Sequence, residues 1–375
     1  MYAYPIKPLQ ETVDKILYSG AGRSIPTTIV GLHPQTWPSV ALPTLPFSFG
    51  VARSHDCTCG EVADRLLWAK MHTAAGVFHW TLSDTFIDAH AAAGRKVYWQ
   101  IQSTPAWDST GATVDAYGQA GGDLAPLTVN ANGLYTHLYD FVVALLTRYA
   151  GKIFAISPWN EPAWLGTRGK FWAGTEAQMA KVVRTVREAA RSVDPTVIVT
   201  CPDFADTSLI SAFMAVSDGA TGALSPQTAV QNCDAWVAHS YNGNSFASNT
   251  GSAIHKNISL FKDLLVAAGV ANPVMYLTEC GWTSAATTFF LLTPAEQAKM
   301  IGRCYLHAGA MGLSSYIIYG YETSFSGTIR DNPAAQAIIE DIHTRFAGQT
   351  FTEIAQTTKG RIKCTKVGGE VLYFL

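Results

Sequence analysis

Eight short apolar runs, rich in β-branched and aromatic residues, recur along the 375-residue chain, and amphipathic stretches separate them. This alternation is typical of βα units, in which each strand of a parallel sheet is followed by a helix that covers it. Eight such units close a TIM barrel, which typically needs about 250 residues. We therefore predict an α/β fold, a (β/α)8 barrel with long loops. The runs are residues 28–33, 49–53, 96–101, 152–158, 196–200, 235–239, 274–278 and 315–319.

The segments between and after these runs carry the stop signals of helices. Gly94 and Gly312 each follow an amphipathic stretch, as helix-ending glycines do. Beyond a last predicted helix near residues 332–346, short segments typical of antiparallel strands follow. We predict that residues 1–346 form the barrel with an N-terminal extension. Residues 347–375 are predicted to add short strands of an accessory β-sheet packed on it.

The composition is that of a folded globular protein, with 48% apolar and 14% charged residues. A net charge of −2 gives no electrostatic reason to expect nucleic acid or an anionic membrane as a partner. No apolar run approaches the roughly 18 residues of a transmembrane helix. The seven cysteines show neither zinc-ligand spacing nor a disulfide framework. We expect no metal and no cofactor.

The N-terminus lacks the basic segment and apolar core of a secretory signal peptide. The low charge nevertheless implies a surface rich in Ser, Thr, Asn, Gln and Gly, which suits secreted or particle-borne proteins. On this ground we favour an extracellular or phage-particle-associated location, with a cytoplasmic location as the alternative. The sequence does not indicate an oligomeric state.

Two glutamates stand where predicted strands end. Glu161 closes the segment after the fourth run, and Glu279 directly follows the seventh. Catalytic groups of a TIM barrel lie at the C-terminal strand ends, and strands four and seven are nearly opposite each other. Retaining glycosidases use two carboxyl groups about 5–5.5 Å apart, whose mutual repulsion is expected to raise the pKa of the acid. Either glutamate alone is more simply interpreted as a capping or ion-pair residue.

The local sequences of these glutamates resemble the motifs of glycoside hydrolase clan A. Trp159–Pro162 matches the W-N-E-P signature of the fourth strand, and Thr278–Trp282 matches the T-E-x-G-W form of the seventh-strand motif. The chain looks most like family 39, which includes β-xylosidases and exopolysaccharide endo-hydrolases. The resemblance implies that Glu161 is the acid/base and Glu279 the nucleophile. Further similar segments are residues 51–56, 76–80, 103–107 and 148–153.

The resemblance also implies roles for two polar residues beside the glutamates. Asn160 would bond the sugar 2-hydroxyl, an interaction that tightens in the transition state. The alternative for Asn160 is an ordinary turn residue. Arg53 would be a fixed cation that holds Glu279 in its carboxylate form. The alternative for Arg53 is a structural ion pair with Asp56.

Three more residues at strand ends are candidates through the same resemblance. Tyr241 would hydrogen-bond the nucleophile, and His239 would line the floor of the site. A single strand-end histidine is as often a structural residue, so both interpretations of His239 stay open. His33, after the first run, has a weaker claim to the site.

Aromatic residues gather at or just beyond the predicted strand ends, where they can stack on the C–H faces of sugar rings. Some of them must instead belong to the barrel core. Trp107, Trp164 and Trp282 are the foremost candidates for substrate binding. Glu322 is either a third substrate-contacting carboxylate or an exposed loop residue. The aromatic set is Trp37, Trp99, Trp107, Trp164, Trp172, Trp282, Tyr319 and Tyr321.

Together these features predict a retaining glycoside hydrolase whose partner is a polysaccharide or oligosaccharide substrate. We favour endo-cleavage of a bacterial exopolysaccharide or capsule, with an exo-acting β-xylosidase-like enzyme as the alternative. A carbohydrate-binding barrel without catalysis is the rival from another class, and it would have lost one glutamate. A metal-dependent amidohydrolase is disfavoured, because His33 is followed by Pro34 and Gln35 instead of a second histidine.

Overall fold

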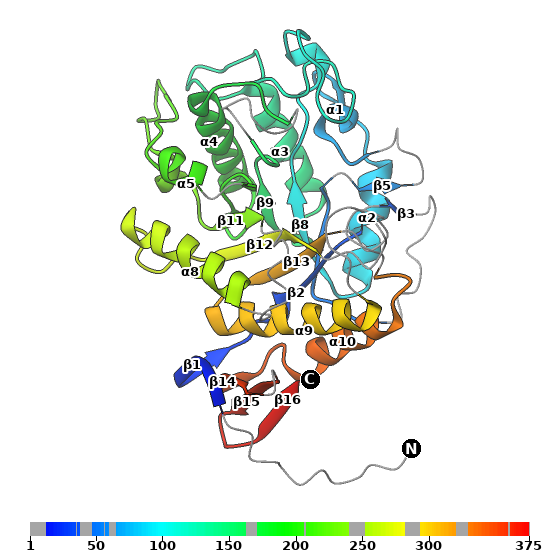
Figure 1. Ribbon diagram of the computed structural model, residues 1–375. Helices are drawn as coiled ribbons and strands as arrows, with labels where there is room; N and C mark the ends of the chain where they lie inside the picture. The colour runs from blue at the N-terminus through cyan, green and yellow to red at the C-terminus, as the bar shows by residue number, and fades with distance from the viewer. Residues whose placement is uncertain are drawn as a thin grey trace.

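The computed structural model describes residues 13–34, 36–37, 47–55, 57–59, 65–162, 171–205, 208–239, 252–281, 293–319, 329–358 and 361–374. At its centre eight strands form one sheet in which every neighbouring pair is parallel (Figure 1). The order is β10 (Ile198–Val199), β9 (Ile153–Ser157), β8 (Lys96–Gln100), β4 (Val51–Arg53), β2 (Val30–His33), β13 (Ser315–Tyr319), β12 (Met275–Cys280) and β11 (Trp236–His239).

The two ends of this order meet, so the sheet closes into a barrel. A parallel bridge joins Thr200, just after β10, to Ala235, just before β11. The Cys201 amide also donates to the Ala235 carbonyl at 2.9 Å. Each of the eight predicted runs overlaps one of these strands, which confirms the predicted (β/α)8 barrel.

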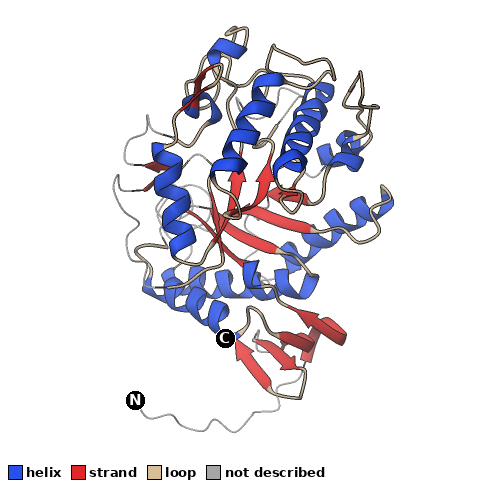
Figure 2. Ribbon diagram, turned by 180° about the vertical axis from the view of Figure 1, so that it is seen from behind, coloured by secondary structure: helices blue, strands red, loops and turns tan. Residues whose placement is uncertain are grey.

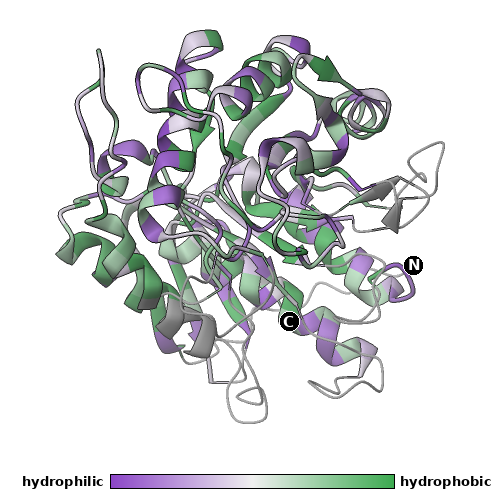
Figure 3. Cartoon of the chain, turned by 90° about the horizontal axis from the view of Figure 1, so that it is seen from above, coloured by the Kyte–Doolittle hydropathy of each residue, from purple (hydrophilic) through white to green (hydrophobic). Residues whose placement is uncertain are grey.

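Helices surround the strands (Figure 2). Seen from above, the helices carry alternating hydrophilic and hydrophobic stretches, as expected for helices with one face on a core (Figure 3). The helices are α1 (Trp68–Met71), α2 (Thr81–Ala92), α3 (Thr136–Arg148), α4 (Glu176–Val193), α5 (Ser208–Met214), α6 (Ala229–Asn232), α8 (Ser252–Ala267), α9 (Pro294–Met311) and α10 (Pro333–Arg345).

Local sequence explains where α9 begins and ends. Thr293 and Glu296 form a capping box at its start, where their side chains satisfy amides that the first turn leaves unpaired. Pro294 fits the first turn because its missing N–H has no partner there. Gly312 ends the helix with φ of 82°, a left-handed conformation that costs glycine little. The predicted stop signal is therefore confirmed.

Short elements that the periodicity did not predict fill the connections. Thr27–Ile29 form a 3-10 turn, η1, before β2. The short helix α1 is a single turn, and Leu67 before it is extended. A hairpin of β6 (His72–Ala74) and β7 (Val77–Phe78) follows. A small parallel pair is made by β3 (Thr36–Trp37) and β5 (Thr58–Cys59).

A four-stranded antiparallel sheet lies beside α9 and α10, away from the barrel strands (Figure 1). Its order is β1 (Val13–Ser24), β14 (Thr350–Thr357), β15 (Ile362–Lys366) and β16 (Val371–Phe374), which confirms the predicted C-terminal β-region. Packing on α9 is close: a Cβ at Gly302 would collide with the Phe374 ring. The N-terminal extension, assigned with the barrel from the sequence, contributes β1 to this accessory sheet. The division of the chain at residue 346 stays a prediction.

No helix in the described part of the chain is long and apolar enough to cross a bilayer.

Candidate active site

Glu161 follows β9 and is presented by an unusual backbone conformation. Its φ is 42°, in the left-handed region, which costs a non-glycine residue about 1–3 kcal/mol. Long-range pairing holds it there, because the Glu161 amide donates to the Asp203 carbonyl at 2.8 Å and the Asp203 amide to the Trp159 carbonyl at 2.9 Å. The Glu161 side chain keeps 24% exposure and so remains accessible at the C-terminal face of the barrel.

Glu279 lies in β12, and its side chain points to the same place. Its carboxylate is only 7% exposed and accepts a hydrogen bond from Arg53 Nη1 at 2.6 Å. Donor and acceptor atoms of Glu161, His239 and Glu279 all lie within 4.8 Å of one another. The structure therefore brings together the two glutamates on which the sequence analysis depends.

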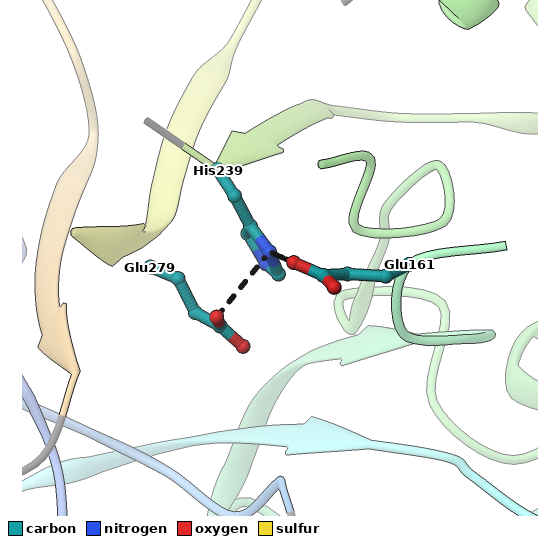
Figure 4. Close-up of side chains that lie close together, drawn as sticks. All are labelled: Glu161, His239 and Glu279. Carbon is teal, nitrogen blue, oxygen red and sulfur yellow. Dashed lines mark hydrogen bonds and ion pairs between the residues drawn. The ribbon is translucent and has the colours of Figure 1, made fainter. Parts of the chain in front are cut away.

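His239 ends β11 and stands between the two carboxylates (Figure 4). Its Nδ1 lies 2.6 Å from Glu161 Oε1 and 3.4 Å from Glu279 Oε2. Its Nε2 faces Asp203 Oδ2 at the longer distance of 3.8 Å. Of the two interpretations of His239, the structure favours the one that places it in the site.

Arg53 ends β4, is fully buried and contacts several site residues at once. Besides Glu279, its Nη2 donates to Asn160 Oδ1 at 2.9 Å and Asp203 Oδ2 at 3.0 Å, and it also contacts Gln100. Burial alone would lower the pKa of Arg53, but the charges of Glu279 and Asp203 hold it above its ordinary value. The alternative partner, Asp56, lies outside the described residues.

Asn160 is buried beside Glu161, and its amide group is fixed in place. Its Oδ1 accepts from Arg53 Nη2 at 2.9 Å and from Gln100 Nε2 at 3.4 Å. Its backbone amide donates to Gln102 Oε1 at 3.0 Å. The NH₂ group of the side chain is thus the part of Asn160 that is suited to contact a substrate hydroxyl.

Asp203 is a site residue that sequence analysis missed. It follows β10 and is fully buried, and its carboxylate accepts hydrogen bonds from four other strands or their ends. The donors are Arg53 Nη2 at 3.0 Å, Tyr98 Oη at 2.8 Å, Ser157 Oγ at 2.7 Å and Thr278 Oγ1 at 3.0 Å. The available signal was position: an acidic residue three places after the fifth run, at the same barrel face as Glu161 and Glu279.

The protonation of the His239–Glu161 pair differs from the sequence expectation. Burial lowers the pKa of His239, but Glu279, Asp203 and Glu161 together raise it to about 9. Burial raises the pKa of Glu161, yet the hydrogen bond and positive charge of His239 outweigh this and lower it. The expected raised pKa of Glu161 is therefore wrong, because a charged imidazole faces it.

The raised pKa of His239 predicts how the free energy of unfolding depends on pH. A group whose pKa rises on folding, from 6.5 to about 9, contributes stability fully below pH 6.5 and loses it as the pH rises through 9. We expect the wild type to lose about 3 kcal/mol more free energy of unfolding than His239→Gln between pH 6 and about pH 10. Urea unfolding of both proteins across this pH range measures the difference. If the free energy of unfolding changed with pH equally in both proteins, the prediction would be contradicted.

His33 and Tyr319 are linked through His55 to the cluster of Glu161, His239 and Glu279. The His33 ring centroid is 4.7 Å from that of Tyr319 and 5.4 Å from that of His55. His55 Nε2 is 3.8 Å from Glu279 Oε1 and 3.3 Å from the hydroxyl of Tyr117. The loop after β8 therefore reaches the Glu279 side of the site through Tyr117 and His55.

Among the aromatic candidates, Trp107 lies in the 3-10 turn η2 (Ala106–Asp108) and is 36% exposed. Its indole donates to the His72 carbonyl at 2.8 Å, and its ring packs on His72 and His137. None of these contacts is with Glu161, His239 or Glu279, so a role of Trp107 in substrate binding stays a prediction. Trp99 and Trp172 belong to the hydrophobic core. Outside the described residues lie Trp164, Tyr241, Trp282, Tyr321, Glu322 and the side chain of Trp37.

The three convergent side chains also have the residue types of a metal site. The oxygens of Glu161 and Glu279 and the Nδ1 of His239 are close enough for one ion. However, a ligating histidine must be neutral, whereas both carboxylates favour its protonated form here. Arg53 already supplies a cation to Glu279 at 2.6 Å.

Solved structures similar to this chain are barrels of the same kind. A family 39 glycoside hydrolase from Xanthomonas axonopodis pv. citri matches with a TM-score of 0.61 and 16% identity, over 96% of this chain and 76% of that one. A family 39 β-xylosidase from Caulobacter crescentus matches with 0.60 and 17%, over 95% and 80%. A family 30 endoxylanase from Clostridium papyrosolvens matches with 0.52 and 13%, over 95% and 80%.

No protein-family model and no curated protein matches the chain. At the identities of the solved structures, the likeness concerns the fold. At that level it confirms the resemblance to family 39 that the strand-end motifs predicted.

Proposed function

We propose that this chain is a retaining glycoside hydrolase with Glu161 as general acid/base and Glu279 as nucleophile. The observation that carries the proposal is that carboxylate oxygens from two opposite strand ends approach within 4.8 Å. Retaining enzymes hold their carboxyl groups about 5–5.5 Å apart, whereas inverting enzymes need about 6.5–9.5 Å to admit a water molecule. The similarity to solved glycoside hydrolases supports the same chemistry.

The reaction proceeds in two displacements. Glu279 attacks the anomeric carbon and forms a glycosyl ester, while Glu161 donates a proton to the departing glycosidic oxygen. Glu161 then takes a proton from water, and the water oxygen displaces the Glu279 carboxylate from the sugar. Each step moves one proton and exchanges one bond at the anomeric carbon, so two carboxyl groups suffice.

Two neighbours prepare this chemistry. Arg53 Nη1 fixes the orientation of the Glu279 carboxylate through its 2.6 Å hydrogen bond. Arg53 Nη2 and Gln100 Nε2 hold the Asn160 amide oxygen, so its NH₂ group can donate to the sugar 2-hydroxyl. A donor fixed before the reaction stabilises the charge that develops in the transition state without a reorganisation cost.

For the substrate, we propose internal cleavage of a bacterial exopolysaccharide or capsule. The support is the long connection after β8, which hydrogen bonds within it order around Asp115 and Asp108. It places the Tyr117 hydroxyl 3.3 Å from His55, whose Nε2 lies 3.8 Å from Glu279. An exo-acting β-xylosidase-like activity is the second candidate, favoured by the likeness to the Caulobacter crescentus β-xylosidase. A binding-only barrel has no need for paired carboxylates and a charged histidine.

A product assay tests the proposal. Wild type and Glu279→Ala are incubated with bacterial exopolysaccharides, plant xylans and aryl xylosides, and products are followed by mass spectrometry and proton NMR. We expect oligosaccharides from the wild type only, with the first-formed anomer matching the configuration of the cleaved bond. An inverted first product would refute the retaining mechanism. Equal release by both proteins would remove Glu279 as nucleophile, and release of monosaccharides alone would favour the exo-acting enzyme.

A further inference from the structure

We propose that Asp203 is a positioning residue that keeps His239 protonated, so that His239 serves as the proton store for Glu161. This inference rests on the proposed function, because it concerns how the acid of that reaction is supplied with its proton. Asp203 touches neither proposed catalytic carboxylate. It acts through His239, whose two nitrogens face Glu161 and Asp203 on opposite sides of one ring.

The charge of Asp203 is fixed by its surroundings. The carboxylate is fully buried, and each oxygen accepts two of its four hydrogen bonds: Oδ1 from Tyr98 and Ser157, and Oδ2 from Arg53 and Thr278. Burial would raise the pKa of Asp203, but His239, Arg53 and Ser157 lower it below its ordinary value. Asp203 therefore stays negative and lies 3.8 Å from His239 Nε2.

The described ionisable groups around His239 come from five barrel strands or the residues that follow them. Glu161 follows β9, Asp203 follows β10 and Glu279 lies in β12, so three carboxylates converge on the imidazole. Arg53 of β4 touches both Asp203 and Glu279, and the Tyr98 hydroxyl of β8 touches Asp203. His55 approaches Glu279 at 3.8 Å. Three negative charges against the one cation favour a proton on His239.

This proton has a direct path to the acid. Nδ1 of His239 is 2.6 Å from Glu161 Oε1, so the proton can pass along that hydrogen bond. Transfer leaves a neutral imidazole and a protonated Glu161, which then protonates the leaving group. When Glu161 later takes a proton from water, the pair regains the proton that it gave up. No proton is gained or lost over a full cycle.

The test compares Asp203→Asn with wild type. Asparagine keeps the shape, and its NH₂ can point at the Tyr98 and Ser157 hydroxyls, which can turn to accept. At high pH, kcat/KM is expected to fall as the His239–Glu161 pair loses its proton; this fall is the alkaline limb of the pH profile. Loss of the negative charge of Asp203 is expected to shift the alkaline limb by about one pH unit toward lower pH. The matched control Ser157→Ala removes one hydrogen bond to Asp203 but leaves the charge, and it should leave the limb in place. An unmoved limb in Asp203→Asn would overturn the proposal.

A second measurement needs no substrate. NMR titration of the His239 imidazole, assigned by its loss in His239→Gln, should show deprotonation at lower pH in Asp203→Asn than in wild type. Asp234→Asn is a control for a general effect of losing a barrel aspartate, because Asp234 pairs with Arg187 and Arg191. If wild type cleaves no glycan, the proposed function fails while this titration still decides the role of Asp203. An unchanged His239 titration would refute that role even in an active enzyme.

Discussion

Replacement of Glu279 by alanine is expected to lower kcat/KM on the order of 10⁵-fold. The variant loses the group that we propose forms the bond to the anomeric carbon, and water is a far weaker nucleophile in its place. The fold should persist, because Arg53 keeps Asp203, Asn160 and Gln100 as partners. Steady-state kinetics on an activated aryl glycoside and far-UV circular dichroism measure both points.

Azide makes this prediction specific to a nucleophile. Azide fits the space left by the Glu279 side chain and should restore cleavage of the activated substrate, giving a glycosyl azide of inverted anomeric configuration. Glu188→Ala is the control, since Glu188 pairs with Arg184 on α4 and should leave activity unchanged. A rescued product of retained configuration would show that Glu279 is not the attacking group.

Replacement of Glu161 by alanine should produce a loss that depends on the leaving group. A poor leaving group needs the proton, so kcat/KM for an unactivated glycan is expected to fall about 10³-fold or more. A dinitrophenyl glycoside departs without a proton, so its first step should change little. Its second step should slow, because no base activates water, and the glycosyl-enzyme should accumulate as a burst of dinitrophenol.

The same variant should also change the pH dependence. With Glu161 absent, the alkaline limb of kcat/KM should disappear, because no acid remains to lose its proton. The pair-wise comparison with Asp203→Asn separates the two roles: Glu161→Ala removes the limb, whereas Asp203→Asn displaces it. Equal losses on activated and unactivated substrates would show that Glu161 acts on binding or folding and not as the acid.

Much of the barrel could be predicted from the sequence because its signals are local. Periodicity within a few residues marked all eight strands, and a helix-ending glycine, Gly312, marked the end of α9. The placement of Glu161 and Glu279 at strand ends could be predicted from the positions along the sequence at which the strands end. Barrel closure then brought both to one face, as the fold requires.

The accessory sheet shows where local patterns stop being sufficient. The strand propensity of β14 was visible, but its partner β1 lies at the other end of the chain, with Val13 opposite Thr357. A strand pattern does not specify which distant edge it pairs with, because many edges satisfy the same hydrogen bonds. The N-terminal extension could therefore be assigned only from the tertiary structure.

By itself the sequence determined the barrel, the strand ends and the identity of two carboxylates. Only the tertiary structure decided their electrostatics. Asp203 gained its four donors from four other barrel strands or their ends, and His239 became charged because three carboxylates from different strands surround it. The pKa of Glu161 fell, against the expectation from its motif, because the hydrogen bond and positive charge of His239 outweigh burial. A pKa depends on distances between charges in a buried space, and those distances exist only once the barrel has closed.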